Sequence, residues 1–171
     1  WIAARIFDDR GQATTAAIHA ALRWVLDPDG NPTTADAPHV LNASWSGDDI
    51  RCNLEFAADL QALHQAGILP VFAAGTHTPI SPATLPTAFP VGAIDDAEHL
   101  YFDSARGPSP CATPEDYFYF PRLVAPGVNI RTTDNFGLYT EVEGTPVAAA
   151  HVAGTLALLL SARPGLSAAE Q

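Results

Sequence analysis

Short apolar runs alternate along this chain with longer segments whose apolar residues recur at helical spacing, and this alternation limits the fold more than any other feature. The runs predict buried strands at residues 1–7, 39–45, 68–74, 89–94 and 123–125. Strands that alternate with helices are typical of parallel sheets covered on both faces. The sequence therefore predicts a layered α/β fold with a mostly parallel sheet, without internal repeats or a linker that divides it.

Three segments predict helices. The first begins after Thr14 or Thr15, either of which can cap it, and ends at a loop rich in proline and glycine. The second spans residues 53–66, with Gly67 placed to end it. The third spans residues 145–162, and polar residues interrupt it before it reaches the roughly 20 apolar residues that a bilayer span requires. We expect this last segment to be a buried core helix.

The charge of the chain excludes several classes of partner. Its 8 basic residues are all arginine and face 19 acidic residues, for a formal net charge of −11. Phosphate backbones and anionic membrane surfaces repel such a chain. We therefore expect no nucleic-acid partner, and the interrupted apolar stretch described above predicts no membrane span.

Four separated segments carry the functional signal. They are residues 1–15 (WIAARIFDDRGQATT), 37–47 (APHVLNASWSG), 67–76 (GILPVFAAGT), and 124–130 with 144–154 (VAPGVNI and GTPVAAAHVAG). In this order they resemble motifs of the subtilisin-like serine peptidases (subtilases, peptidase family S8), nearest to the bacillopeptidase F type. The resemblance implies a three-layer subtilisin-like fold, with residues 1–171 as a partial subtilase domain that lacks the N-terminal portion. Because Trp1 and its apolar neighbours read like the inside of a strand, we expect the chain to be cut from something longer.

The resemblance also implies that the catalytic positions are degenerate. Pro146 stands where the family has its nucleophilic serine, and proline has neither a hydroxyl nor a backbone N–H. Thr76 stands where the family has an asparagine that helps to hold the oxyanion, and loss of one such donor costs about 100- to 1000-fold in rate. The D-T-G and H-G-T-H segments that supply the family's aspartate and histidine do not occur in the 171 residues. We predict no intact catalytic residue.

Substrate-binding positions also follow from the resemblance. It implies that a strand edge formed by Ser44, Trp45, Ser46 and Gly47 pairs with an extended peptide. It also implies that Ala73, Ala74 and Gly75 form a wall of the primary specificity pocket. A peptide can add to such an edge without being cleaved. The alternative is that these residues are ordinary strand ends, with Trp45 filling a gap in the core.

Two histidines lie within or beside these motifs. His77 follows Thr76, and with no hydroxyl or thiol partner assigned we interpret it as a loop residue. His151 matches the histidine that follows the nucleophile in the family, and the resemblance implies a structural hydrogen bond on a buried helix.

The sequence contains no cysteine or histidine pair at zinc spacing, and we expect no cofactor. Asp27, Asp29 and Asn31 could collect a calcium ion, but a solvated turn explains them equally well. Cys52 and Cys111 are either two buried thiols or a disulfide that stabilises the fold by about 4 kcal/mol. Because subtilases of this type are exported, the resemblance favours the disulfide and an extracellular or cell-surface location.

Three functions remain open. The chain is a non-catalytic module for peptide binding or assembly, or part of an active secreted serine endopeptidase whose aspartate and histidine come from an upstream or separate segment, or the structural subunit of a polymer. In each case we expect a peptide or protein partner, because the parent fold without its upstream part exposes apolar faces and a strand edge. An upstream polypeptide or a homo-oligomer could cover them.

Overall fold

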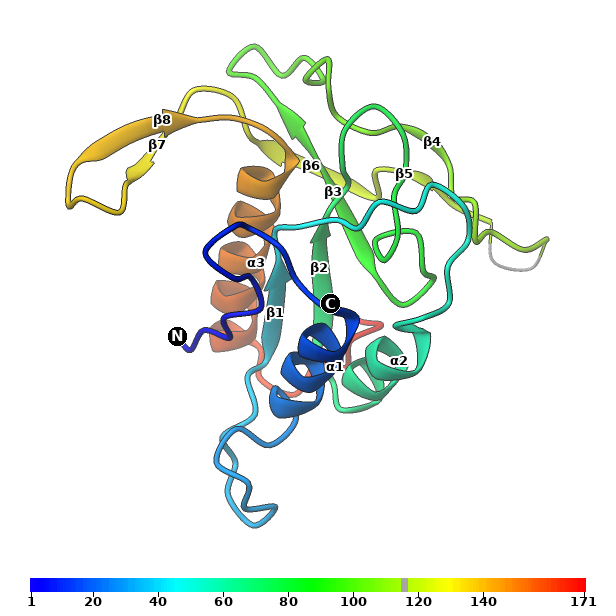
Figure 1. The fold of residues 1–171 in the computed structure, drawn as a ribbon, viewed down its shortest axis with the longest axis vertical. Helices are drawn as coiled ribbons and strands as arrows, with labels where there is room; N and C mark the ends of the chain where they lie inside the picture. Colours follow the sequence, from blue (N-terminus) through cyan, green and yellow to red (C-terminus); the bar gives the residue numbers. More distant parts are fainter. Residues whose placement is uncertain (115–116) are drawn as a thin grey trace.

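A parallel sheet of four strands forms the centre of the molecule (Figure 1). The computed structural model describes residues 1–114 and 117–171. The strands lie side by side in the order β1 (Val40–Ala43), β2 (Leu69–Ala73), β3 (Phe89–Ile94) and β6 (Leu123–Pro126). All three pairings between them are parallel. The predicted layered α/β fold with a mostly parallel sheet is confirmed.

Three helices cover this sheet: α1 (Thr15–Trp24), α2 (Ala57–Gln65) and α3 (Thr145–Ala162). The hydroxyl of Thr14 caps α1 by accepting a hydrogen bond from the N–H of Ala17 at 3.1 Å. Gly67 follows α2 with φ +83°, a left-handed conformation that glycine adopts without strain. The predicted helices are confirmed, although α2 begins at Ala57 rather than at residue 53.

The core consists of two apolar clusters, one on each face of the sheet. Successive side chains of a strand point to opposite faces, so β2 contributes to both clusters. Phe72 joins the cluster of α1 and α2 residues, whereas Leu69 and Val71 join the cluster of α3 residues. The wholly buried strand β2 therefore holds the helical layers together.

The predicted first strand was wrong. Residues 1–7 form no strand in the structure and are mostly exposed. A strand is held by ladder hydrogen bonds, and among the described strands β1 pairs only with β2. Apolar composition predicted a strand here, but without a pairing partner the segment stays irregular.

The prediction that α3 is a buried core helix was also wrong in part, because only one of its faces packs against the sheet. Ala148, Val152 and Leu156 are buried there, whereas Leu158 is 74% exposed. By length and composition α3 could cross a membrane, and 33% of its residues are buried within the fold. The exposed half of α3 is an apolar surface.

Two antiparallel pairs were not predicted. A hairpin of β7 (Ile130–Thr133) and β8 (Tyr139–Val142) extends from the body of the fold, and β4 (Gly107–Pro108) pairs with β5 (Tyr119–Phe120). The hairpin has a sequence signal that the prediction did not use, namely a short loop with Gly137 between two runs that contain β-branched residues.

A disulfide joins Cys52 to Cys111, which confirms the bridge and excludes two free thiols. It links the segment before α2 to the long loop that carries β4 and β5. Because these parts are 59 residues apart in sequence, the bond restricts a large loop in the unfolded chain.

We predict that the double variant Cys52→Ala/Cys111→Ala loses about 4 kcal/mol of unfolding free energy, because the unfolded chain regains the entropy of that loop. Urea denaturation followed by circular dichroism measures the difference. The unmodified chain under reducing conditions is the control and should lose a similar amount. A loss below about 1 kcal/mol in both would contradict this account of the bridge.

Candidate functional site

The predicted site residues meet where the carboxyl ends of β1 and β2 face the first turn of α3. Ser44, just after β1, donates a hydrogen bond from its hydroxyl to the backbone carbonyl of Pro146 at 2.7 Å. Gly75, which lies two residues beyond β2, donates its N–H to the hydroxyl of Thr145 at 3.2 Å. Open α/β sheets bind ligands outside the carboxyl ends of their strands. The fold thus brings together residues from three distant parts of the sequence at such an end.

Two glycines allow α3 to begin so close to the sheet. Gly144, the residue before α3, has φ +118° and donates its N–H to the carbonyl of Gly127 at 2.7 Å. A Cβ on Gly127 would lie 2.6 Å from the Cβ of Ala93 and 2.9 Å from the carbonyl oxygen of Gly144. A side chain at residue 127 would separate the segments, whereas residue 144 needs glycine for its positive φ. The glycines of the A-P-G-V and G-T-P motifs therefore set the start of α3 against β3.

Thr145 is a site residue that the sequence analysis missed. Its side chain is buried, and its hydroxyl lies 3.2 Å from the N–H and 3.4 Å from the carbonyl oxygen of Gly75. This hydroxyl satisfies backbone groups at the buried end of β2. The sequence did place a hydroxyl residue, Thr145, at the predicted start of the helix. From sequence alone, however, a threonine that caps its own helix cannot be distinguished from one that binds a distant strand.

Pro146 lies in the first turn of α3, where its missing N–H breaks no helical hydrogen bond. The N–H groups of Val147 and Ala148 both point to the carbonyl of Gly144, at 3.2 and 3.4 Å. At residue 146 the turn therefore presents neither a hydroxyl nor an N–H, and its next two donors already have a partner.

The turn that contains Thr76 and His77 lies on the surface. His77 has φ +61°, and its N–H donates to the carbonyl of Asp103 at 2.7 Å. Its ring Nε2 lies 3.1 Å from Oδ1 of Asp103. Within the part of the chain that the structure describes, this ring contacts a carboxylate and no hydroxyl or thiol. We therefore keep the interpretation of His77 as a loop residue.

A further pair of contacts ties the loop after β3 to the start of α3. The phenol of Tyr101 lies 3.0 Å from Oε1 of Glu143 and 3.4 Å from Oδ2 of Asp103. Burial, followed by the hydrogen bond to Glu143, raises the pKa of Tyr101 to about 12. The phenol thus keeps its proton and acts as a donor at neutral pH. Sequence gave no signal for this link, because the residues are far apart.

The residues expected to bind a peptide have contacts within the fold. Ala73 and Ala74 are 2% and 0% exposed. The ring of Trp45 packs edge-on against Phe72, with centroids 5.6 Å apart. The N–H of Gly47 donates to the carbonyl of Ser81 at 2.9 Å. These contacts favour the core interpretation of Trp45, and peptide binding at these positions stays a prediction.

His151 differs from its prediction, because it lies on the exposed face of α3 rather than in the core. Its Nδ1 is 3.1 Å from the carbonyl oxygen of Val147, one helical turn earlier. A local hydrogen bond is present, but the expected burial of His151 was wrong. The periodicity of a predominantly apolar helix does not reveal which of its faces meets the sheet.

The two aspartates of the calcium hypothesis lie together in an exposed loop. Carboxylate oxygens of Asp27, Asp29 and Asp36 lie within 4.8 Å of one another. Asn31 accepts hydrogen bonds from the N–H and hydroxyl of Thr33. Asp36 is a further carboxylate of this cluster that the sequence analysis did not include. Calcium and a solvated turn both remain interpretations of this loop.

Comparison with known proteins identifies the family. The sequence model of the subtilase family (peptidase S8) matches residues 1–171, and this chain belongs to that family. It is 36% identical over 182 residues to Bacillopeptidase F of Bacillus subtilis (strain 168) and 29% identical over 175 residues to Subtilisin DY of Bacillus licheniformis. Among solved structures, a cold-adapted subtilisin-like serine proteinase superposes with a TM-score of 0.78 at 26% identity. Sphericase, at 24% identity, shares the fold with a TM-score of 0.81.

The matches cover nearly all of this chain but only part of its relatives. The chain is covered to 99% and 98% by the two sequence relatives, and it spans 12% of Bacillopeptidase F and 56% of Subtilisin DY. It is covered to 97% and 96% by the two structures and spans 55% of each. The expected subtilisin-like fold is confirmed, and this chain corresponds to part of that fold.

We predict that Thr145→Val lowers the free energy of unfolding by about 1–3 kcal/mol, because it leaves the buried N–H of Gly75 without its acceptor. Thr155→Val is the matched control on the same helix. Thr155 is exposed, and among the described residues its hydroxyl bonds only within α3, so its loss should change stability by less than about 0.5 kcal/mol. Equal effects of the two variants, measured by urea denaturation, would argue against the role of Thr145.

Proposed function

We propose that this chain is a non-catalytic portion of a subtilase domain that acts by associating with further polypeptide. The observation that carries the proposal is Pro146 in the first turn of α3. The family model and the four motifs in register support the assignment of this residue to the nucleophile position. Attack on a peptide carbonyl needs a hydroxyl at that position, and proline has none.

The oxyanion side of the reaction is also weakened. An oxyanion needs donors held at about 2.7–3.1 Å in a water-excluded site. Pro146 has no N–H, and the following two N–H groups already donate to Gly144. Thr76, at the asparagine position of the motif, is exposed. Two donors and the nucleophile are therefore altered together, which fits loss of catalysis better than a shift in substrate.

A groove beside β1 supports association with further polypeptide. It has a volume of about 480 Å³ and runs between residues 1–6, α1 and β1. Apolar side chains such as Ile2, Leu22 and Leu41 line it. The outer edge of β1 carries backbone groups that pair with no other described strand. An extended apolar segment that lies in this β1 groove can bury these side chains and add a strand to the sheet.

The exposed face of α3 supplies a second apolar surface. Together with the β7–β8 hairpin it lines a hollow of about 700 Å³ whose walls include Ile130, Val142 and Leu158. Because the known relatives are longer than this chain, we propose that upstream subtilase polypeptide covers the β1 groove and this hollow. The disulfide fits an oxidising compartment, and we propose an extracellular location.

Membership of a peptidase family favours a second candidate, in which the chain is part of an active secreted serine endopeptidase. The relatives named above include proteinases, and the threonine and glycine of the G-T-P motif hold α3 in place. This candidate requires an aspartate, a histidine and a nucleophile from another segment, so it predicts covalent labelling by serine-directed reagents.

We predict that a fluorophosphonate probe does not label this chain in its natural polypeptide, and that hydrolysis of a fluorogenic peptide stays at background. In subtilisin, removal of the nucleophilic serine lowers kcat by about 10⁶-fold, which indicates the size of the effect when a nucleophile is lost. Subtilisin DY serves as the positive control, and Pro146→Ser tests whether a hydroxyl alone is enough. Inhibitor-sensitive turnover by the unmodified chain would establish the second candidate instead.

We predict that the isolated chain self-associates through its apolar surfaces, and that Ile2→Glu weakens this association by about 10-fold or more, since it places a charge in the β1 groove. Ile50→Glu is the matched control, because Ile50 is similarly exposed, at 63% against 52%, but does not line the groove. Analytical ultracentrifugation measures the size. Growth without limit at higher concentration would favour a polymer subunit, and a monomer that binds no hydrophobic dye would refute the proposal.

A further inference from the structure

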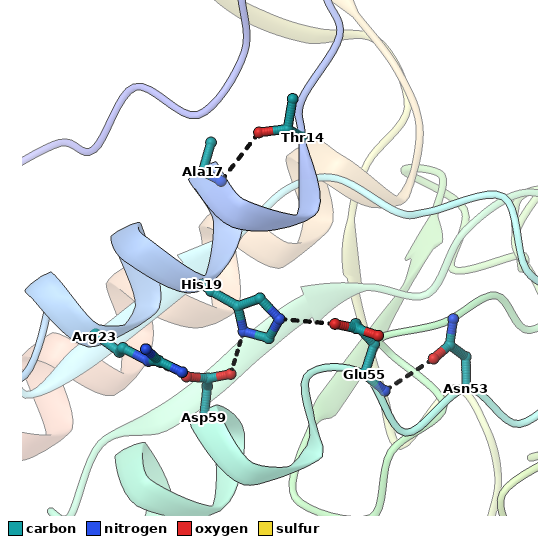
Figure 2. A network of polar contacts seen from close by, with 7 residues as sticks. All are labelled: Thr14, Ala17, His19, Arg23, Asn53, Glu55 and Asp59. Atoms are coloured by element: carbon teal, nitrogen blue, oxygen red, sulfur yellow. Dashed lines mark hydrogen bonds and ion pairs between the residues drawn. The ribbon is translucent and has the colours of Figure 1, made fainter.

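His19 on α1 lies between two carboxylates that come from α2 and from the segment just before it. Its Nδ1 is 2.6 Å from Oδ2 of Asp59, and its Nε2 is 3.0 Å from Oε1 of Glu55. Arg23, one turn later on α1, donates from Nε to the other oxygen of Asp59 at 3.1 Å. Figure 2 shows the ring held between the two acidic side chains. The network joins α1 to the start of α2.

The geometry determines the proton content of the ring. An ionised carboxylate oxygen only accepts hydrogen bonds, so each ring nitrogen must carry a proton to satisfy its partner. A neutral imidazole would turn a lone pair toward one of the carboxylates. The hydrogen bond to Glu55, followed by the one to Asp59, accordingly raises the pKa of His19 above its ordinary value of 6.5.

The two carboxylates that contact the ring differ in their other partners. Asp59 is 8% exposed and keeps Arg23 as a partner whatever the state of His19. Glu55 is half-exposed, and its carboxylate contacts the ring. Phe56 covers the ring at a centroid distance of 4.9 Å. On another side of α1, the N-terminal segment contributes Arg5, which pairs with Asp9.

We propose that His19 is a pH-sensitive clamp that holds α1 against α2 while its ring is protonated and loosens this wall of the β1 groove when the ring loses its proton. The α2 side is anchored, because Cys52 is held by its disulfide three residues before Glu55. The α1 side supplies Ile18, Leu22 and Val25 to the groove. The clamp rests on these contacts and does not depend on the assembly proposed above.

The sign of the pH effect follows from the raised pKa of His19. The stabilisation is fully present below pH 6.5 and disappears as the pH rises through the pKa of the folded state.

The test is an NMR titration of the unmodified chain. Long-range ¹H–¹⁵N spectra should show both nitrogens of His19 protonated at pH 6, with a midpoint above 6.5. Hydrogen-exchange protection of the α1 amides, taken relative to those of α3, should fall by about 2- to 5-fold between pH 5.5 and pH 8.5, the range expected for a partly exposed ion pair. A midpoint at or below 6.5, or a single protonated nitrogen at pH 6, would overturn the clamp.

Glu55→Gln tests the same inference by mutation. A glutamine side chain can donate to or accept from a neutral ring, so this variant should lower the midpoint of His19 and remove most of the pH dependence of α1 protection. Glu141→Gln is the matched control, because Glu141 is exposed on β8, away from α1. An unchanged pH profile in Glu55→Gln, or an equal change in Glu141→Gln, would refute the clamp.

Discussion

The close contact between the start of α3 and the ends of the parallel strands is the constraint on which the rest of the structure depends. Gly127 allows the two segments to approach to a distance that any side chain would prevent, and Gly144 adopts the positive φ that starts α3. Thr145 then satisfies a buried backbone amide at the end of β2. With α3 placed in this way, its apolar face covers one side of the sheet, and α1 and α2 are left to cover the other.

The same contact explains how the fold accommodates a proline at the start of α3. The hydrogen bonds that place the first turn of α3 come from residues on either side of Pro146, and proline is tolerated at the start of a helix. Pro146 therefore fits the scaffold although it supplies neither a hydroxyl nor an N–H.

The molecule is held firmly in its centre and exposes apolar surface at its borders. The disulfide and the buried strand β2 bind the middle of the chain together. By contrast, the β1 edge, the β1 groove and the outer face of α3 carry apolar side chains without cover among the described residues. In this setting α1 is attached by a modest apolar stripe and by the charged contacts of His19 and Arg23. A polar network of that kind can make the position of α1 depend on pH.

The sequence by itself determined the order of the four central strands and the three helices, the parallel α/β class and the family, because these depend on local periodicity and short motifs. Only the tertiary structure decided that residues 1–7 form no strand, that α3 buries one face, and that Thr145, Tyr101 and His19 bind partners far away in sequence. A strand requires a neighbour, and the buried face of a predominantly apolar helix depends on what packs against it. Hydrogen bonds between distant segments arise only from the folded arrangement, so no local pattern could reveal them.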